Sequence, residues 1–253
     1  MARGNSQWEQ PENHRPPAIS ANELQPHEEP TPAMLNLRFT RPAGEILRVL
    51  CLGAHSDDIE IGCGGTILTL LEQYEKVAVQ WVVFSASELR AQEARVSAAA
   101  FLATVSERHV DVKSYRDGFF PFCGAEIKGE FEAIKREFAP DVIFTHYRDD
   151  RHQDHRLISD LTWNTFRSHL VLEYEIPKYD GDLSQPNFFV PLSESVCQRK
   201  IGTIVESFAS QRQKQWFDEE TFRAILRLRG MEANSPTRFA EAFYCRKAVF
   251  GSG

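Results

Sequence analysis

The stretch ILRVLCLGAHSDDIEIGCGGT, residues 46–66, decides how this chain folds. It opens with a nearly continuous apolar run at 46–52, which is typical of a strand buried on both faces of a parallel sheet. A polar loop leads to the glycine-rich segment 62–65, after which apolar residues recur at helical spacing as far as Tyr74. The stretch therefore predicts a strand, a loop and then a helix.

The same alternation continues along the chain. Further strands are predicted at 77–84, 110–112, 141–145, 170–174, 188–190 and 243–249. Helices are predicted at 88–102, 126–138, 157–166, 193–209 and 219–229. Strands that alternate with helices indicate an α/β fold, in which a parallel sheet carries helices on both faces.

The chain is long enough for one globular domain with a tail. It has 253 residues, of which 42% are hydrophobic, so it can bury a full core. Residues 1–36 hold six of the thirteen prolines and show little apolar periodicity. Such a segment cannot offset its ordering entropy alone, so we expect an extension that is disordered or draped over a single domain at 37–253.

Composition excludes several classes of protein. The formal charge is −7 and the basic residues form no stripe, which argues against a nucleic-acid partner. The five cysteines show no C-x-x-C spacing, as expected for buried thiols in a reducing compartment. No apolar segment approaches the ~18 to 20 residues of a membrane span, and the N-terminus lacks the pattern of a signal peptide. We expect a cytoplasmic protein without a membrane span.

Two acidic-histidine clusters each follow a predicted strand: HSDD at 55–58 and HQDH at 152–155. Because the carboxyl ends of parallel strands meet at one edge of a sheet, both should lie in the crevice where open α/β sheets bind ligands. Imidazole and carboxylate groups bind divalent metals, and three protein ligands leave a coordination position for water. The pattern predicts a metal-dependent hydrolase.

Spacing within the clusters suggests separate roles. His55 and Asp58 are three residues apart in a tight turn, so both can reach one ion, and His155 would complete the set. Asp57 then points elsewhere and is free to act as general base. His152 can act as general acid or as a cationic stabiliser of a developing oxyanion.

Each of these residues also has a plainer explanation when taken alone. An Asp between a strand and a helix is often a helix N-cap, which would account for Asp57, Asp58 or Asp154. A lone His152 or His155 would be an ordinary hydrogen-bonded histidine. Two clusters of the same ligand types at one sheet edge favour the metal site.

The glycines at 62–65 open the predicted helix and invite a comparison with phosphate-binding loops. Ile67 occupies the third glycine position of G-x-G-x-x-G, and no G-K-[ST] follows. We therefore predict a tight turn with close packing of helix on strand.

At this point the residues carry a family resemblance. Residues 53–66 closely resemble the first motif of the LmbE-like, or PIG-L, family of zinc-dependent N-deacetylases, and residues 151–155 resemble its second motif. The similarity extends from about residue 46 to the C-terminus, with weaker features at 90–93, 210–211 and 240–243. It implies a Rossmann-like three-layer sandwich with a mostly parallel sheet, and hydrolysis of an N-acyl amide, usually an acetamido group on a sugar.

The resemblance also implies site residues. His55, Asp58 and His155 match the ligands of one zinc ion, Asp57 the general base, and His152 the acid or electrostatic partner. Ser56 stands where the first motif usually has proline. Asp150 stands where some relatives carry a tyrosine, so no tyrosine is assigned to the oxyanion and Tyr147 is only a weak candidate.

The sequence indicates the contacts to the substrate less clearly than it indicates the metal ligands. We predict Arg90 and Arg151 as substrate contacts, the latter as a clamp for a phosphate or carboxylate, although solvated arginines at a helix end are the plainer alternative. Loops at 85–92, 114–124 and 175–190 should wall the pocket. Four aromatic side chains there could stack on a sugar ring, but we expect them to pack in the core: Phe119, Phe120, Phe122 and Tyr179.

Several alternatives stay open at this stage. The protein could be another metal-dependent amidase of the same fold, with a different N-acyl substrate. The ion could be Fe²⁺ or another divalent metal. His55, Asp57 and His155 also fit the two-His, one-carboxylate set of non-haem iron oxygenases, although those enzymes usually have antiparallel β-helix folds. A catalytically silent sugar-binding protein and a homo-oligomer are the remaining options.

Overall fold

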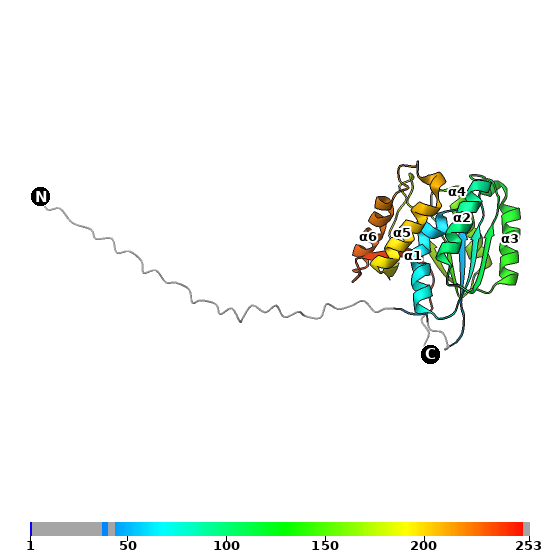
Figure 1. Cartoon of the computed structure of the whole chain (residues 1–253), viewed down its shortest axis with the longest axis horizontal. Coiled ribbons are helices and arrows are strands. Elements are labelled where there is room, and N and C mark those ends of the chain that lie inside the picture. Colours follow the sequence, from blue (N-terminus) through cyan, green and yellow to red (C-terminus); the bar gives the residue numbers. More distant parts are fainter. Residues whose placement is uncertain (2–36, 40–43, 250–253) are drawn as a thin grey trace. The chain divides into compact units, whose positions relative to one another are not determined.

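The computed structural model describes Met1, residues 37–39 and residues 44–249 (Figure 1). Residues 2–36, almost all of the predicted extension, lie outside the described part, so the domain boundary after residue 36 stays a prediction. The chain divides into two compact units, Met1–Thr40 and Arg41–Gly253, and the description below concerns the second. No helix in the described ranges has both the length and the apolar composition to cross a bilayer.

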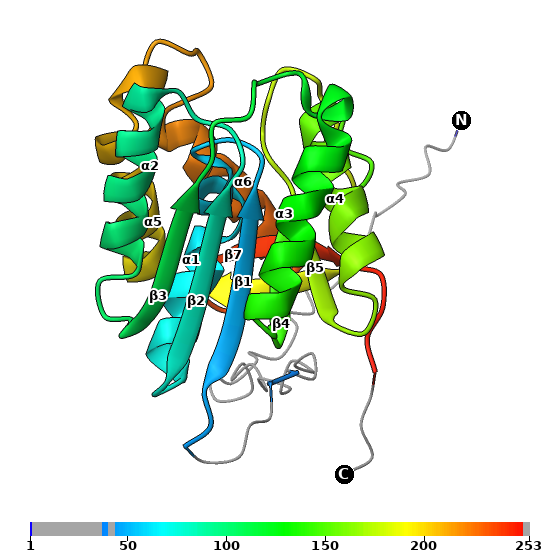
Figure 2. The same cartoon turned by 90° about the vertical axis from the view of Figure 1, so that its right-hand side faces the viewer.

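The second unit is built on a sheet with the spatial order β3-β2-β1-β4-β5-β7-β6 among the described residues (Figure 2). β1 to β5 run parallel, whereas β7 pairs antiparallel with both β5 and β6. The strands are β1 (Leu47–Gly53), β2 (Val77–Val83), β3 (Glu107–Val112), β4 (Val142–His146), β5 (Leu170–Tyr174), β6 (Phe188–Leu192) and β7 (Phe239–Cys245). The mostly parallel sheet confirms the predicted fold class.

Helices cover both faces of the sheet (Figures 1 and 2). α1 packs against α2 and α5, and α5 also contacts α6, while α3 and α4 pack against each other. The α-helices are α1 (Asp58–Gln73), α2 (Glu88–Phe101), α3 (Gly124–Glu137), α4 (Gln153–Thr165), α5 (Glu194–Ser207) and α6 (Glu219–Glu232), with short 3₁₀ turns η1 (Phe120–Phe122) and η2 (Ala209–Gln211).

Burial explains which strands the sequence predicts well. Every residue of β2 and β4 is buried, as continuous apolar runs require. β3 is an edge strand whose first three residues are charged or polar and exposed, so the apolar pattern reveals only its last three. The terminal strand β7 begins at Phe239 and ends at Cys245, so the predicted range 243–249 lies too far along the chain.

Two helices begin about one turn earlier than predicted. α1 starts at Asp58, so the glycines at 62–65 lie inside the helix, and the predicted tight turn there is wrong. The predicted close packing of the helix on a strand is present: a Cβ on Gly62 would run into the ring of Tyr174 on β5. A Cβ on Gly64 would lie 2.7 Å from Phe101 of α2. α4 starts at Gln153 rather than Leu157, which places the second acidic-histidine cluster in its first turn.

A buried ion pair ties the middle of α1 to the C-terminal strand. Lys200 Nζ on α5 donates to Glu241 Oε1 on β7 (2.6 Å) and to the carbonyl oxygen of Ile61 (2.7 Å). The two oxygens of Glu241 also accept hydrogen bonds from the backbone N–H groups of Gly65 and Thr66, at 2.7 and 2.6 Å. Both charged side chains are only 3% exposed, so the pairing satisfies groups that would be costly to bury alone.

The packing of α1 leads to a stability prediction. Gly62→Ala should lower the free energy of unfolding by about 1 to 3 kcal/mol or more, because the added methyl group overlaps the Tyr174 ring. Gly129→Ala, in α3 with nothing within 4 Å of the place the new methyl group would take, is the matched control and should raise it by about 0.5 to 1 kcal/mol. Urea unfolding of the metal-free protein measures both. Equal effects would contradict the close approach of α1 to β5.

Candidate metal centre

The first cluster lies in the loop between β1 and α1. The Asp58 carboxylate accepts a hydrogen bond from the backbone N–H of His55 at 2.6 Å, which closes the loop into a tight turn. Asp57 occupies the N-cap position of α1, yet its side chain makes no capping hydrogen bond. The N-cap explanation is therefore wrong for both carboxylates, and both are available to the site.

Three side-chain atoms from the two clusters converge, and we call them the inner cluster: His55 Nδ1, Asp58 Oδ2 and His155 Nε2. The separations are 3.2 Å between the two imidazoles, 3.4 Å from His55 to Asp58 and 3.6 Å from His155 to Asp58. Donor atoms on a tetrahedral zinc ion, with bonds of about 2.0 to 2.1 Å, stand roughly 3.3 Å apart. The inner cluster therefore fits one such ion.

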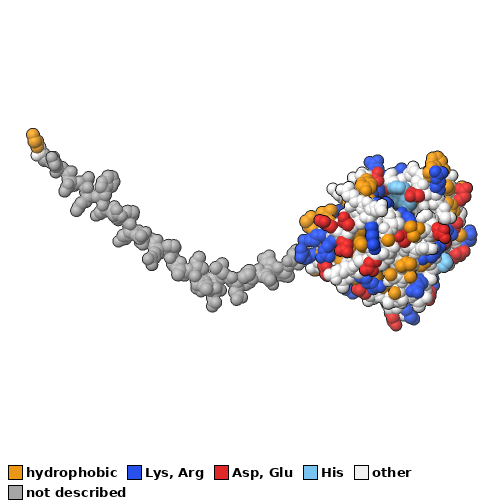
Figure 3. All heavy atoms as spheres, turned by 45° about the horizontal axis from the view of Figure 1, so that its top comes forward, with side chains coloured by type: hydrophobic (Ala, Val, Ile, Leu, Met, Phe, Trp, Pro, Cys, Tyr) orange, Lys and Arg blue, Asp and Glu red, His pale blue; other side chains and the backbone are white. Residues whose placement is uncertain are grey.

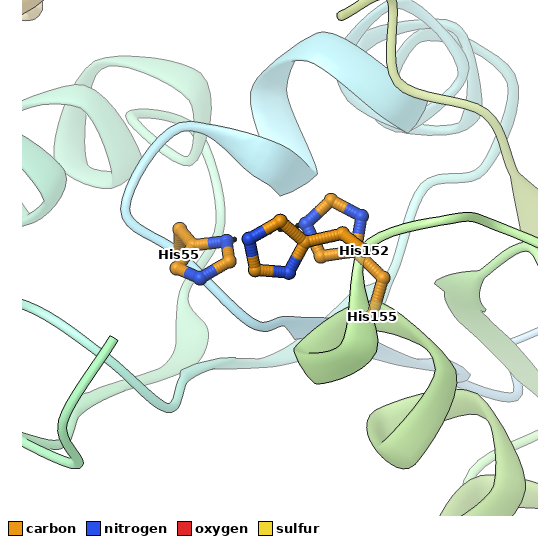
Figure 4. A group of neighbouring side chains, drawn as sticks. All are labelled: His55, His152 and His155. Atoms are coloured by element: carbon orange, nitrogen blue, oxygen red, sulfur yellow. Dashed lines mark hydrogen bonds between the residues drawn. The ribbon is translucent and has the colours of Figure 1, made fainter. Parts of the chain in front are cut away.

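His155 reaches the inner cluster from the first turn of α4 (Figure 4). Its Nδ1 lies 2.9 Å from Asp150 Oδ2, and this hydrogen bond leaves the Nε2 lone pair for a metal. Lys178 Nζ donates to the same carboxylate oxygen at 2.9 Å. In the sequence, Asp150 was noted only as a departure from relatives, and its contact with His155 was missed. The available signal was a carboxylate two residues before His152.

His146, the last residue of β4, is a second buried group that sequence reasoning missed. Its ring stacks on His155 with centroids 3.9 Å apart, and its Nε2 lies 3.1 Å from Asp58 Oδ2. The same nitrogen accepts a hydrogen bond from the backbone N–H of Ala54 at 2.9 Å. Because that bond uses the Nε2 lone pair, we assign His146 to holding the loop and not to the ligand set. The signal was a histidine at the end of a predicted strand.

Asp57, the residue before Asp58 in the chain, has a partner of its own. Arg90, in the first turn of α2, donates from its guanidinium to Asp57 Oδ1 at 2.7 Å. Asp57 is 5% exposed, so a charge-assisted bond of this kind holds its carboxylate in place. The structure thus places Arg90, predicted as a substrate contact, against the predicted general base.

Other predicted contacts lie farther from the inner cluster. The Arg151 side chain is exposed, and its backbone N–H is bound by Asp182. Tyr147 stacks on Tyr244 with ring centroids 3.8 Å apart. Of the four aromatic side chains expected in the core, Phe120 is buried, whereas the other three are exposed by 38%, 80% and 73%: Phe119, Phe122 and Tyr179. The core expectation is wrong for these three: in η1 the ring of Phe120 takes the buried position, while its neighbours Phe119 and Phe122 stay at the surface.

The second ring nitrogen of His55 faces a different set of groups. His55 Nε2 lies 3.0 Å from Asp117 Oδ1 and 3.4 Å from Asp154 Oδ2. Asp154 also accepts the backbone N–H groups of Gly118 (2.6 Å) and Phe120 (3.1 Å), so it fastens the loop before α3 to α4. The N-cap explanation is wrong here too, since the cap of α4 is His152, whose side chain accepts from the Asp154 N–H.

The surrounding charges set the protonation of the site. Burial opposes the charge of Asp58, but the neighbouring imidazoles outweigh it and hold the pKa of this carboxyl well below its usual value. Burial, reinforced by adjacent histidines, lowers the pKa of both His155 and His152. Burial also opposes the charge of His55, but the carboxylates around it, Asp58 foremost, outweigh burial and raise the pKa. An ionised Asp58 and a neutral His155 are the states that metal binding requires.

The contact between Asp150 and His155 leads to a binding prediction. Asp150→Asn should weaken the affinity for Zn²⁺ by about 10- to 100-fold, because His155 loses the carboxylate that orients it. Asp149→Asn, at the neighbouring position with a 69% exposed side chain, is the matched control and should bind normally. Competition with a chromophoric chelator measures both affinities. Equal affinities in the two variants would remove Asp150 from the site.

Comparison with known families gives a match over part of the chain. Residues 50–166 match the family model described as PIG-L: GlcNAc-PI de-N-acetylase. The matched segment runs from β1 to the end of α4 and so contains both acidic-histidine clusters.

Comparison with solved structures extends the similarity to most of the chain. N,N'-diacetylchitobiose deacetylase from Pyrococcus horikoshii matches with a TM-score of 0.59 and 22% identity over 78% of this chain and 82% of its own. The zinc-inhibited form of teicoplanin deacetylase Orf2 gives 0.60 and 14% over 78% and 97%. GalB, the 4-carboxy-2-hydroxymuconate hydratase from Pseudomonas putida KT2440, gives 0.64 and 17% over 82% and 99%. Similarity at this level is one of fold, and the hydratase among these structures illustrates that a fold does not specify a reaction.

Proposed function

Residues 50–166 place this chain in the PIG-L family, and from that premise we propose that the protein is a zinc-dependent N-deacetylase that hydrolyses the acetamide of an N-acetylated amino sugar. The enzyme class, a deacetylase of the hydrolase type, follows from the family. We propose in addition that the metal is zinc, that the substrate is a sugar-linked small molecule and that the protein is cytoplasmic.

One observation carries the proposal. Three donor atoms from segments about a hundred residues apart lie within 3.6 Å of one another, and the carboxylate next to Asp58 in the chain, Asp57, is paired with Arg90. A protein that only binds a sugar has no need of a spare carboxylate next to a metal site. The mostly parallel sheet also argues against the iron-oxygenase alternative, which rested on spacing alone.

The residues around the inner cluster have distinct tasks in this reaction. His55, Asp58 and His155 would hold a divalent ion, which would supply Lewis acidity to the amide carbonyl and to water. Asp57 takes the proton from the attacking water: Arg90 occupies its Oδ1, so we assign the transfer to Oδ2. The amide C–N bond breaks as the proton held by Asp57 reaches the amine leaving group.

His152 is assigned to the oxyanion. Its lowered pKa keeps the imidazole neutral near pH 7, and its Nδ1 accepts the hydrogen bond from the Asp154 N–H at 3.3 Å. The proton therefore lies on Nε2, where it can donate a hydrogen bond to the oxygen that gains charge as the carbonyl is attacked. A neutral donor of this kind stabilises the oxyanion without first having to be protonated.

The choice of an acetylated amino sugar has two sources of support. The matching family model is described as GlcNAc-PI de-N-acetylase, and two proteins of similar structure are named N,N'-diacetylchitobiose deacetylase and teicoplanin deacetylase. Exposed aromatic side chains of the loops at 114–124 and 175–190 provide apolar surface for a ring, as noted for Phe122 and Tyr179. Another N-acyl amide is the alternative within the same chemistry.

The role of Asp57 leads to a kinetic prediction. Asp57→Asn should lower kcat by about 10² to 10⁴-fold, because the general base is lost, while about one zinc ion per chain is retained. Asp160→Asn, a carboxylate on α4 whose side chain is 54% exposed, is the matched control and should keep wild-type kcat. Steady-state kinetics with metal analysis of the same samples gives both quantities. Near-normal turnover of Asp57→Asn with zinc bound would contradict the assignment.

The proposed function as a whole is tested by free-amine release. The zinc-loaded protein is assayed on a panel of N-acetylglucosamine derivatives, including nucleotide-linked and antibiotic-like ones, with N-propionyl and peptide amides as comparison. Release of amine and acetate in equal amounts from an acetamido sugar is the expected result. Zinc binding without cleavage of any panel member would favour a silent binding protein, and cleavage of the comparison amides alone would favour another amidase.

A further inference from the structure

The imidazole of His55 separates two groups of potential metal donors. Its Nδ1 belongs to the inner cluster, and its Nε2 faces Asp117 Oδ1 at 3.0 Å and Asp154 Oδ2 at 3.4 Å. His152 lies next to the same ring, with centroids 4.8 Å apart (Figure 4). The donor atoms of these four residues all lie within 4.8 Å of one another. We call Asp117, Asp154 and His152 the outer cluster.

We propose that the outer cluster is a second, weaker site for a divalent cation of the zinc class, and that its occupation inhibits the enzyme. Two carboxylates and an imidazole form a donor set that suits Zn²⁺. Asp154 is already held in place by two backbone N–H groups. His152 can ligate through Nε2 once its proton moves to Nδ1, which gives up the 3.3 Å capping hydrogen bond from the Asp154 N–H. The Asp117 side chain, 68% exposed, is free to turn towards an arriving ion.

The outer cluster is distinct from the inner one in access and in donors. Asp58 and His155 of the inner cluster are 5% and 3% exposed, whereas Asp117 is open to solvent. A neutral imidazole offers one lone pair, so His55 cannot serve both ions without losing its remaining N–H. The outer ion is therefore bound by Asp117, Asp154, His152 and water. Because two divalent cations this close repel each other, it binds more weakly than the inner ion.

The inhibitory effect rests on the proposed function, whereas the binding itself does not. His152 is assigned above as the hydrogen-bond donor to the oxyanion. A second ion would bind this imidazole, which could then no longer donate to the oxyanion. The ion would also stand on the solvent side of His55, the side from which a substrate has to approach. His55 and His152 are both partly exposed, so solvent reaches their rings. Figure 3 shows histidine side chains among acidic and basic groups on the face that comes forward.

A simpler use of the same carboxylates makes the opposite prediction. Asp117 and Asp154 could act only as acceptors of the His55 N–H, as carboxylates behind a metal-bound histidine commonly do. In that case the protein holds one ion however much zinc is added.

Counting bound ions separates the two explanations without any substrate. Wild-type protein and Asp117→Asn are dialysed to equilibrium against zinc from substoichiometric to millimolar concentration, and bound zinc is measured by atomic spectrometry. We expect two ions per wild-type chain, one tight and one weak, with the weak affinity at least about tenfold lower in Asp117→Asn and the tight one intact. Glu137→Gln, which removes an exposed carboxylate from α3, is the matched control and should bind two. A single ion in the wild type, or an unchanged weak ion in Asp117→Asn, overturns the proposal.

A kinetic comparison tests the inhibitory part. For each variant, the rate at excess zinc is divided by its own rate at one equivalent, so that any direct effect of Asp117 on turnover cancels. This ratio should fall well below one for the wild type and for Glu137→Gln, and should stay close to one for Asp117→Asn. Two bound ions without inhibition overturn the inhibitory role. Two bound ions in a protein that cleaves no acetamide would instead count against the proposed function, while leaving the second site in place.

Discussion

The site depends on the parallel pairing of β1 with β4. β1 pairs with β2 on one side and with β4 on the other, and the register sets Val49 against Val142 and Cys51 against Phe144. The chain leaves these two central strands at the same edge of the sheet, in the loop to α1 and in the loop to α4. Residues separated by about a hundred positions are thereby brought within 3.6 Å of one another, as expected where the strand order of an open α/β sheet reverses.

The sequence was most informative where structure is local. Apolar runs located the buried strands, and the three-residue spacing of His55 and Asp58 was sufficient to predict that their side chains lie close together. It was least informative where a residue acts through a distant partner. The support of His155 by Asp150, the pairing of Asp57 with Arg90 and the stacking of His146 all depend on strand and helix positions that periodicity does not encode.

The glycines of α1 illustrate the same limit. Glycine is a common sign of a turn, and its use as a spacer in a helix interior becomes evident only when the neighbour is known. Here Gly62 faces Tyr174 and Gly64 faces Phe101, side chains that arrive from β5 and α2. The helix that carries Asp58 at its first position therefore approaches the sheet more closely than any larger residue would allow. Metal-site geometry and core packing are set by the same contact.

The ion pair between Lys200 and Glu241 has a consequence for how the protein is made. The segment that matches the family model ends at residue 166, but two backbone N–H groups of α1 donate to Glu241, on β7. A ribosome-bound chain that has emerged only as far as α4 lacks this acceptor. The contact between α1 and the C-terminal strand therefore forms only after β7 has been synthesised.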